Sequence, residues 1–149
     1  MRSILASLVL TLAVSTAWSQ QPAQPTKTYA SSADVAALLA KAKADHKAGQ
    51  PLVAERILTL APYAASLEYR TAVGPAAVHE KEAEMFYVIE GSATLMTGGK
   101  LANEKRTNAE NLTGTAIEGG KSQAVAKGDF VIVPENTPHW FSAIDGTIV

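Results

Sequence analysis

The sequence predicts an all-β domain, a small antiparallel sandwich or barrel with a single helix in front of it. Two observations predict this class. From residue 51 onward, about seven short apolar segments alternate with turns rich in Gly, Pro and Asn, and helical periodicity is confined to residues 31–49. A length of 149 residues favours one domain with a short appendage.

Charge and cysteine content narrow the function classes. Lys and Arg number 13 against 14 Asp and Glu, without blocks of one sign, so the chain has no basic footprint for nucleic acid and no polybasic membrane patch. The chain has no cysteine. This excludes thiolate catalysis, cysteine-ligated zinc and iron–sulfur clusters.

The first 19 residues have the pattern of a cleavable signal peptide. Met1-Arg2 precedes an apolar run at residues 4–18, and the small residues Ala17 and Ser19 occupy the −3 and −1 positions of a cleavage site after Ser19. The alternative, a membrane anchor, is disfavoured because the run is short for a span and no basic cluster follows it. We therefore expect an exported protein, periplasmic or secreted, that leaves the membrane after cleavage.

A linker and a helix are predicted next. Residues 20–30 are polar and contain proline, as linkers do. Residues 31–49 are predicted to form an amphipathic helix, because Ser31 and Asp34 have the spacing of a capping box and Gly49 suits a C-terminal stop. The apolar positions recur at helical spacing at Val35, Leu38, Leu39 and Ala42.

Residues 51–149 are predicted to form the β domain. Residues 98–120 are polar and rich in glycine, and are predicted to be a long hairpin loop. Within this loop, Asn111-Leu112-Thr113 is formally a glycosylation sequence. Residues 84–91 are apolar on both faces of a strand, which indicates a sheet covered on each side, by the N-terminal helix or by a second subunit.

Two of the three histidines lie at positions suited to a site. His79 precedes Glu84 by four intervening residues, so on one continuous strand the two side chains would point to opposite faces. A turn at residues 80–83 would let them converge, with Glu84 opening the next strand. His139 follows a turn at residues 134–136 and is predicted to share a strand face with Phe141.

These two stretches resemble the paired motifs of the cupin family. In the first motif, Glu84 is followed by six residues and then Gly91, and His79 occupies the second histidine position. Ala77 stands where the first histidine is usual, and Thr71 where the leading glycine is usual. In the second motif, the matching positions are Gly128, Pro134 and His139, whereas Asn136 replaces a glycine and Ala143 the final asparagine. Asn136 suits the position because asparagine also accepts left-handed backbone angles. The resemblance covers residues 51–149.

The resemblance implies a small β-barrel or jelly roll, often dimeric, that holds a divalent metal: Fe, Mn, Ni, Cu or Zn. The metal ligands that the resemblance implies are His79, Glu84 and His139. The resemblance assigns no catalytic residue. A second alignment makes His79 the first histidine and places Lys81 at the second position. Glu80 and Glu82 are substitute carboxylates, and Glu82 is also a candidate general base.

Two functions follow from the resemblance. The first is chemistry of the oxygenase, isomerase or lyase type on a small organic molecule. The second is a non-catalytic cupin that binds a small ligand or a partner after losing part of its metal site, which Ala77 favours.

Overall fold

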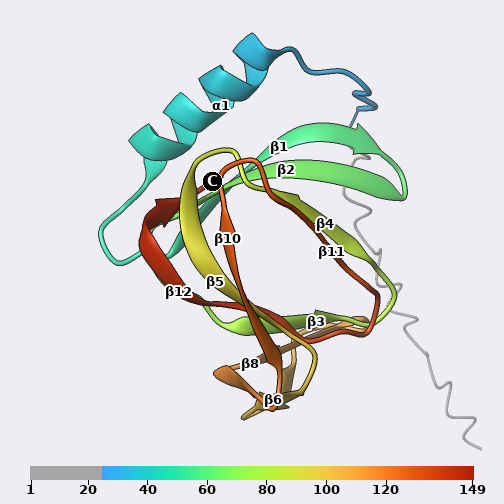
Figure 1. Cartoon of the computed structure of the whole chain (residues 1–149). Helices are drawn as coiled ribbons and strands as arrows, with labels where there is room; N and C mark the ends of the chain where they lie inside the picture. Colours follow the sequence, from blue (N-terminus) through green and yellow to red (C-terminus); the bar gives the residue numbers. More distant parts are fainter. Residues whose placement is uncertain (1–24) are drawn as a thin grey trace, which may run out of the picture.

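The computed structural model describes residues 25–149, and the predicted signal peptide lies outside them. Within the described residues, one helix precedes twelve strands (Figure 1). The elements are α1 (Ser32–Asp45), β1 (Leu52–Leu60), β2 (Tyr63–Arg70), β3 (Ala76–His79), β4 (Glu84–Tyr87), β5 (Gly91–Thr97), β6 (Lys100–Ala102), β7 (Lys105–Arg106), β8 (Asn111–Gly114), β9 (Ala116–Glu118), β10 (Lys121–Ala126), β11 (Phe130–Val133) and β12 (His139–Ile148).

Helix α1 begins at the predicted capping box. The Ser31 side chain accepts a hydrogen bond from the Asp34 backbone, and the Asp34 carboxylate accepts one from the Ser31 backbone at 2.8 Å. The helix ends at Asp45, four residues before Gly49. It packs on β1 and β2, where Ala42 joins a buried apolar cluster.

All recorded strand pairings are antiparallel. The larger sheet runs in the order β1-β2-β12-β3-β8-β7, and β5 pairs with both β12 and β10. Strands β4 and β11 pair only with each other, as do β6 and β9. The strands curve around a common interior, with α1 outside β1 and β2 (Figure 1). The predicted all-β, antiparallel barrel with one N-terminal helix is therefore confirmed.

The prediction of a long hairpin loop at residues 98–120 is wrong. This segment contains β6, β7, β8 and β9. Strand β8 pairs with β3 over four residues, so the segment extends the main sheet instead of projecting from it. The strands escaped prediction because they are only two to four residues long and polar, and their stability comes from pairing with distant partners.

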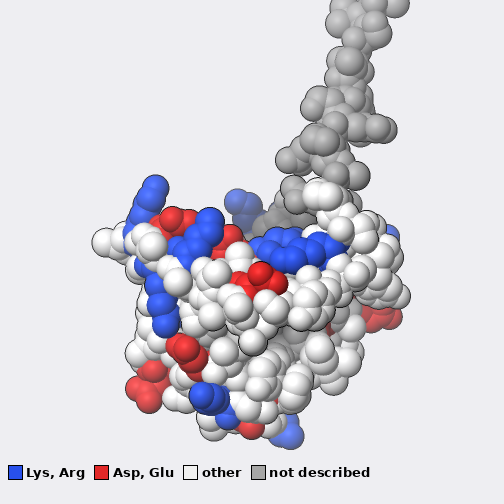
Figure 2. Space-filling model, turned by 90° about the horizontal axis from the view of Figure 1, so that it is seen from above, with Lys and Arg blue, Asp and Glu red and all other residues white. Residues whose placement is uncertain are grey.

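A second apolar cluster fills the barrel interior. Its buried members are Val88, Ala93, Leu95, Val125, Phe141 and Ile148. On the outside, the face of the molecule seen from above in Figure 2 carries basic and acidic side chains interspersed with other residues. No helix in residues 25–149 is long and apolar enough to cross a membrane.

Candidate metal centre

Three strands bring the predicted ligand residues together. His79 ends β3, Glu84 opens β4 and His139 opens β12. Nε2 of His79 lies 3.3 Å from one carboxylate oxygen of Glu84, and Nε2 of His139 lies 3.0 Å from the other. All three residues offer a donor atom within 4.8 Å of the others, so the group could hold a metal ion.

The turn between β3 and β4 causes this convergence. Residues 80–83 belong to neither strand, which confirms the turn predicted from the sequence. Glu80 turns away and is held by the Arg106 guanidinium at 2.7 and 2.9 Å. The Lys81 ammonium group donates a hydrogen bond to the Glu110 carboxylate at 3.2 Å, and 70% of the Lys81 side chain is exposed. The alignment that places Lys81 at a ligand position is therefore wrong, and neither Lys81 nor Glu80 is part of the group.

A chain of hydrogen bonds fixes the proton on His79. The Glu110 backbone donates to Oδ1 of Asn108, which identifies that atom as an oxygen, and Asn111 Nδ2 donates to the same oxygen at 3.0 Å. Asn111 therefore presents Oδ1, an acceptor, to Nδ1 of His79. Nδ1 of His79 must carry the hydrogen, and its Nε2 offers a lone pair toward Glu84 whenever the ring is neutral.

A different contact places the hydrogen of His139 on Nδ1 as well. Its Nδ1 lies 3.1 Å from the carbonyl oxygen of Thr137, which can only accept. Nε2 of His139 is thus also a lone-pair donor to a cation when the ring is neutral. Three acceptors then face one another, an arrangement that is favourable only with a cation or protons between them. The donor set therefore fits a divalent metal.

The charges around Glu84 favour its ionised form. Burial on its own would raise the pKa of Glu84, but the hydrogen bond with His139 and the charges of His139, His79 and Arg70 outweigh it and lower the pKa below its ordinary value. Glu84 is thus a carboxylate across the neutral range. Two imidazoles and one carboxylate suit Fe, Mn, Ni, Cu or Zn better than Mg or Ca, which prefer oxygen ligands.

Position 77, where the family pattern usually has a histidine, also lies at the site. Ala77 is the direct partner of His139 across β3 and β12 and is two residues from His79 on the same strand, so it shares their face. Its methyl group carries no donor atom. The centre thus has three protein ligands available and leaves several coordination positions open.

Aromatic side chains support the ligands from the barrel interior. The ring of Phe86 lies 6.0 Å from that of His139 and 5.7 Å, edge-on, from that of Phe141. The Arg70 guanidinium lies 5.1 Å from the Phe141 ring and is held by Glu68. His139 is buried, whereas His79 and Glu84 are partly exposed, so solvent reaches the group from one side.

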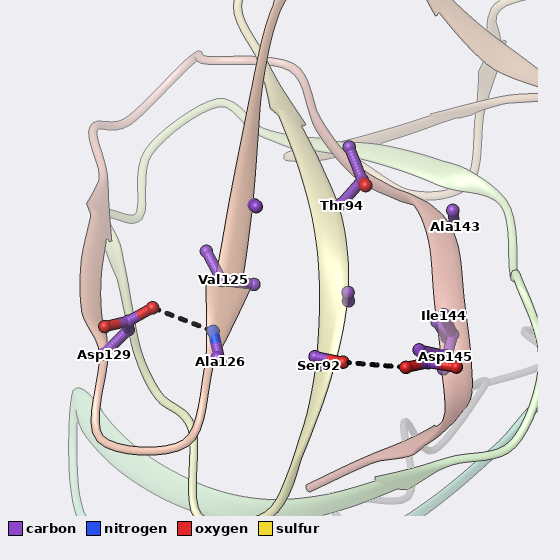
Figure 3. A pocket seen from close by; sticks show the side chains of 10 residues that line it. Ser92, Thr94, Val125, Ala126, Asp129, Ala143, Ile144 and Asp145 are labelled. Atoms are coloured by element: carbon purple, nitrogen blue, oxygen red, sulfur yellow. Dashed lines mark hydrogen bonds between the residues drawn. The ribbon is translucent and has the colours of Figure 1, made fainter.

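Two hollows lie near the strands of the site. The larger, of about 510 Å³, is lined by β5, β10 and β12 together with Asp129, and contains none of the three ligand residues (Figure 3). The smaller, of about 200 Å³, is likewise not lined by any of the three, but it shares a strand row with His139. One of its walls is Thr97, the direct partner of His139, and another is Lys121, the direct partner of Thr97.

Two features of this site are not predicted by the sequence. Asn111 lies in a formal glycosylation sequence, and only the structure shows that its side chain orients His79. No local pattern marks Lys121, because only the strand register places it in the row of His139. His46, the remaining histidine, lies outside the site and bonds the Gln50 carbonyl and the Thr71 hydroxyl.

A family model described as cupin matches residues 53–149. The match covers about two thirds of the chain and includes all three ligand residues. Comparison with curated proteins and with solved structures finds no significant match.

Proposed function

This chain belongs to the cupin family, and from that premise we propose that it is an exported protein that holds one divalent metal with His79, Glu84 and His139 and acts on a small organic molecule. One observation carries the proposal: two imidazole nitrogens with assigned lone pairs and one ionised carboxylate point at a common centre. A bound metal with open positions supplies Lewis acidity toward an oxygen of the substrate. The candidate metals are Fe, Mn, Ni, Cu and Zn.

The side chains of this chain have separate tasks. The Asn111 side chain accepts a hydrogen bond from Nδ1–H of His79, and the Thr137 carbonyl accepts one from Nδ1–H of His139. Both Nε2 atoms therefore stay directed inward. Glu84 supplies the negative charge that offsets part of the charge of a dication. Phe86 and Phe141 exclude water from the inner side of the ligands.

The smaller hollow, whose lining includes Thr97, the direct partner of His139, supports a proposal about the substrate. A volume of about 200 Å³ is below that of sites for drug-sized ligands, so the molecule is small. Among the described residues, Lys121 is the only charged one that lines it, and Gln123 and Thr97 add polar groups. A small organic anion, with its negative charge toward Lys121 and a polar atom toward the metal, fits this lining best.

Metal analysis tests the proposal. The mature chain, residues 20–149, should contain close to one transition metal per chain after reconstitution with Fe(II), Mn(II), Ni(II), Cu(II) or Zn(II). Glu84→Ala and His139→Ala should lose it, whereas His46→Ala, which removes the histidine outside the site, should keep it. Wild-type protein that takes up none of these metals would contradict the metal proposal and favour the second candidate, a non-catalytic ligand-binding cupin, which the alanine at position 77 also favours.

The export half of the proposal has its own test. Mass spectrometry of the protein from a bacterial periplasm or culture medium should show an N-terminus at Gln20. An intact Met1 on protein that stays in the cytoplasm would contradict export without bearing on the metal.

A further inference from the structure

One charged pair inside the barrel takes no part in the candidate metal centre. On β2, Leu67 and Tyr69 pack in the apolar cluster next to α1. Glu68 and Arg70 alternate with them along the strand and therefore face the barrel interior. The Arg70 guanidinium lies 5.1 Å from the centre of the Phe141 ring, which belongs to the interior cluster. A cation with only 19% of its side chain exposed thus lies within the barrel.

Glu68 occupies one edge of this guanidinium and leaves another edge free. Its Oε2 accepts hydrogen bonds from Nε and Nη2 of Arg70 at 3.0 and 2.7 Å. A guanidinium has five N–H donors, so three remain on Nη1 and Nη2 without a partner among the described residues. Nη1 is also reached by solvent, since no buried side-chain nitrogen in residues 25–149 lacks a hydrogen-bond partner. The edge formed by Nη1 and Nη2 suits a carboxylate, which accepts two parallel hydrogen bonds.

Arg106 shows how the same edge is filled where an arginine joins two parts of the chain. Its Nη1 and Nη2 donate to the two carboxylate oxygens of Glu80 at 2.7 and 2.9 Å, and half of its side chain is exposed. The corresponding edge of Arg70 has no carboxylate partner in the described part of the chain, although Arg70 is the less exposed of the two. The bond with Glu68 therefore holds Arg70 in place and leaves its carboxylate-binding edge unused.

The free edge lies one row of side chains from the metal centre. His139 and Phe141 point to the same side of β12 and are two residues apart, which separates them by about 6.6 Å along the strand. The Arg70 guanidinium lies over Phe141, and its Nη1 is 4.0 Å from the place that a Cβ on Gly74 would take. Gly74 stands three residues before Ala77. Arg70 thus approaches the centre from the side where position 77 carries no ligand atom.

The charge of Arg70 also acts on the centre. Burial raises the pKa of Glu84, whereas the contacts with both histidines and the charge of Arg70 lower it. Lys121 belongs to a different wall, because it joins the row of His139 through Thr97 on β5. Two separate cations therefore lie around the centre, one on β2 and one on β10.

We propose that Arg70 is a substrate-binding residue, whose free edge holds a carboxylate of the small molecule while another polar atom of that molecule meets the metal. This inference rests on the proposed function and narrows its substrate class. The carboxylate at Arg70 is additional to the negative group placed toward Lys121. The substrate is then a small acid with two anionic groups.

Acetate titration of residues 20–149 at constant ionic strength, followed by the arginine Nε–H signals in NMR, tests the proposal. This chain has three arginines, Arg56, Arg70 and Arg106, and the signal lost in Arg70→Lys belongs to Arg70. That signal should shift saturably in metal-free protein, and at least ~10-fold tighter with Zn(II) bound, because the ion attracts the same anion. The Arg106 signal should stay in place, since Glu80 fills its edge. Acetamide, the uncharged analogue, should not shift the Arg70 signal.

Variants measured through the His139 ring signals of the Zn(II) form complete the test. Arg70→Gln should weaken acetate binding about 10- to 100-fold, and Arg70→Lys should weaken it less, because lysine keeps the charge without the fork. The matched control, Arg56→Gln, removes an exposed arginine on β1 and should change nothing.

Two results would overturn the proposal. One is an Arg70 signal that shows no saturable shift up to ~100 mM acetate, and the other is an Arg70→Gln variant that binds acetate as tightly as the wild-type chain. Equal acetate affinity with and without bound Zn(II) would overturn the placement of the carboxylate beside the centre. A chain that takes up no Zn(II) but shows the Arg70 shift would contradict the metal function and support the carboxylate site.

Discussion

Replacing Glu84 with Gln should destabilise the metal-free protein at pH 7, and the loss should diminish as the pH falls below 4.5. The substitution keeps the size of the side chain and replaces a carboxylate oxygen by an amide group. The two Nε2 atoms lie 3.0 and 3.3 Å from that carboxylate, so the substitution changes the contacts of both histidines.

The lowered pKa of Glu84 means that the folded state favours the carboxylate form more than the unfolded chain does. The amide introduced by Glu84→Gln carries no charge, so the variant loses this contribution. The loss at pH 7 should be about 1–2 kcal/mol, allowing for solvent screening of a side chain that is one-third exposed.

The pKa of Glu84 sets the limits of this experiment. It is lowered in the folded state, so its ionic contribution is present above the unfolded pKa, ordinarily 4.5, and is lost only as the pH falls through the lower folded value. A measurement at pH 7 therefore contains the full contribution of Glu84, and measurements from pH 4.5 downward follow its loss.

Urea unfolding with a chelator, at pH 7 and at steps from pH 4.5 downward, is the assay. Glu82→Gln is the control, because Glu82 is exposed on the preceding turn and its substitution should change stability little at any of these pH values. A loss of stability in Glu84→Gln that persists undiminished far below pH 4.5 would refute the ionic contribution of Glu84. The variant should also lose the metal-dependent stabilisation of the wild-type chain.

Three further substitutions probe the surroundings of the site. Asn111→Ala should weaken metal binding about 10- to 100-fold while leaving the fold intact, measured by competition with a chromophoric chelator, because it removes the acceptor that orients His79. Ala77→His should strengthen metal binding at least ~10-fold in the same assay, since position 77 faces His139; unchanged affinity would mean that the added ring does not reach the centre. Phe141→Ala should lower the free energy of unfolding by about 3–5 kcal/mol in urea, because this side chain is 8% exposed in the interior cluster, and a loss below about 1 kcal/mol would contradict that packing.

Local patterns explain why much of this structure could be predicted. The capping box of α1 needs only residues three apart, and the turn between His79 and Glu84 needs only residues 80–83. The left-handed backbone expected at Asn136 is present, with φ of 54°. Each of these features is determined within a few positions along the chain.

The features that escaped prediction depend on register between distant segments. Asn111 meets His79 because β8 pairs with β3, and nothing in residues 98–120 alone shows that pairing. Lys121 joins the row of His139 through two successive strand pairings. Polar residues in short strands have little intrinsic signal, so their roles become visible only when the sheet is assembled.

The separation of the three candidate ligands along the chain means that the site is complete only when β12 is in place. His79 and Glu84 are close in sequence, but His139 arrives only after a closure of more than fifty residues, when β12 inserts between β3 and β5. A nascent or unfolded polypeptide therefore has only two of these three residues close together in sequence. Tight binding of an ion should therefore show that the barrel has closed. A chelator should accelerate unfolding only to the extent that β12 can leave the sheet.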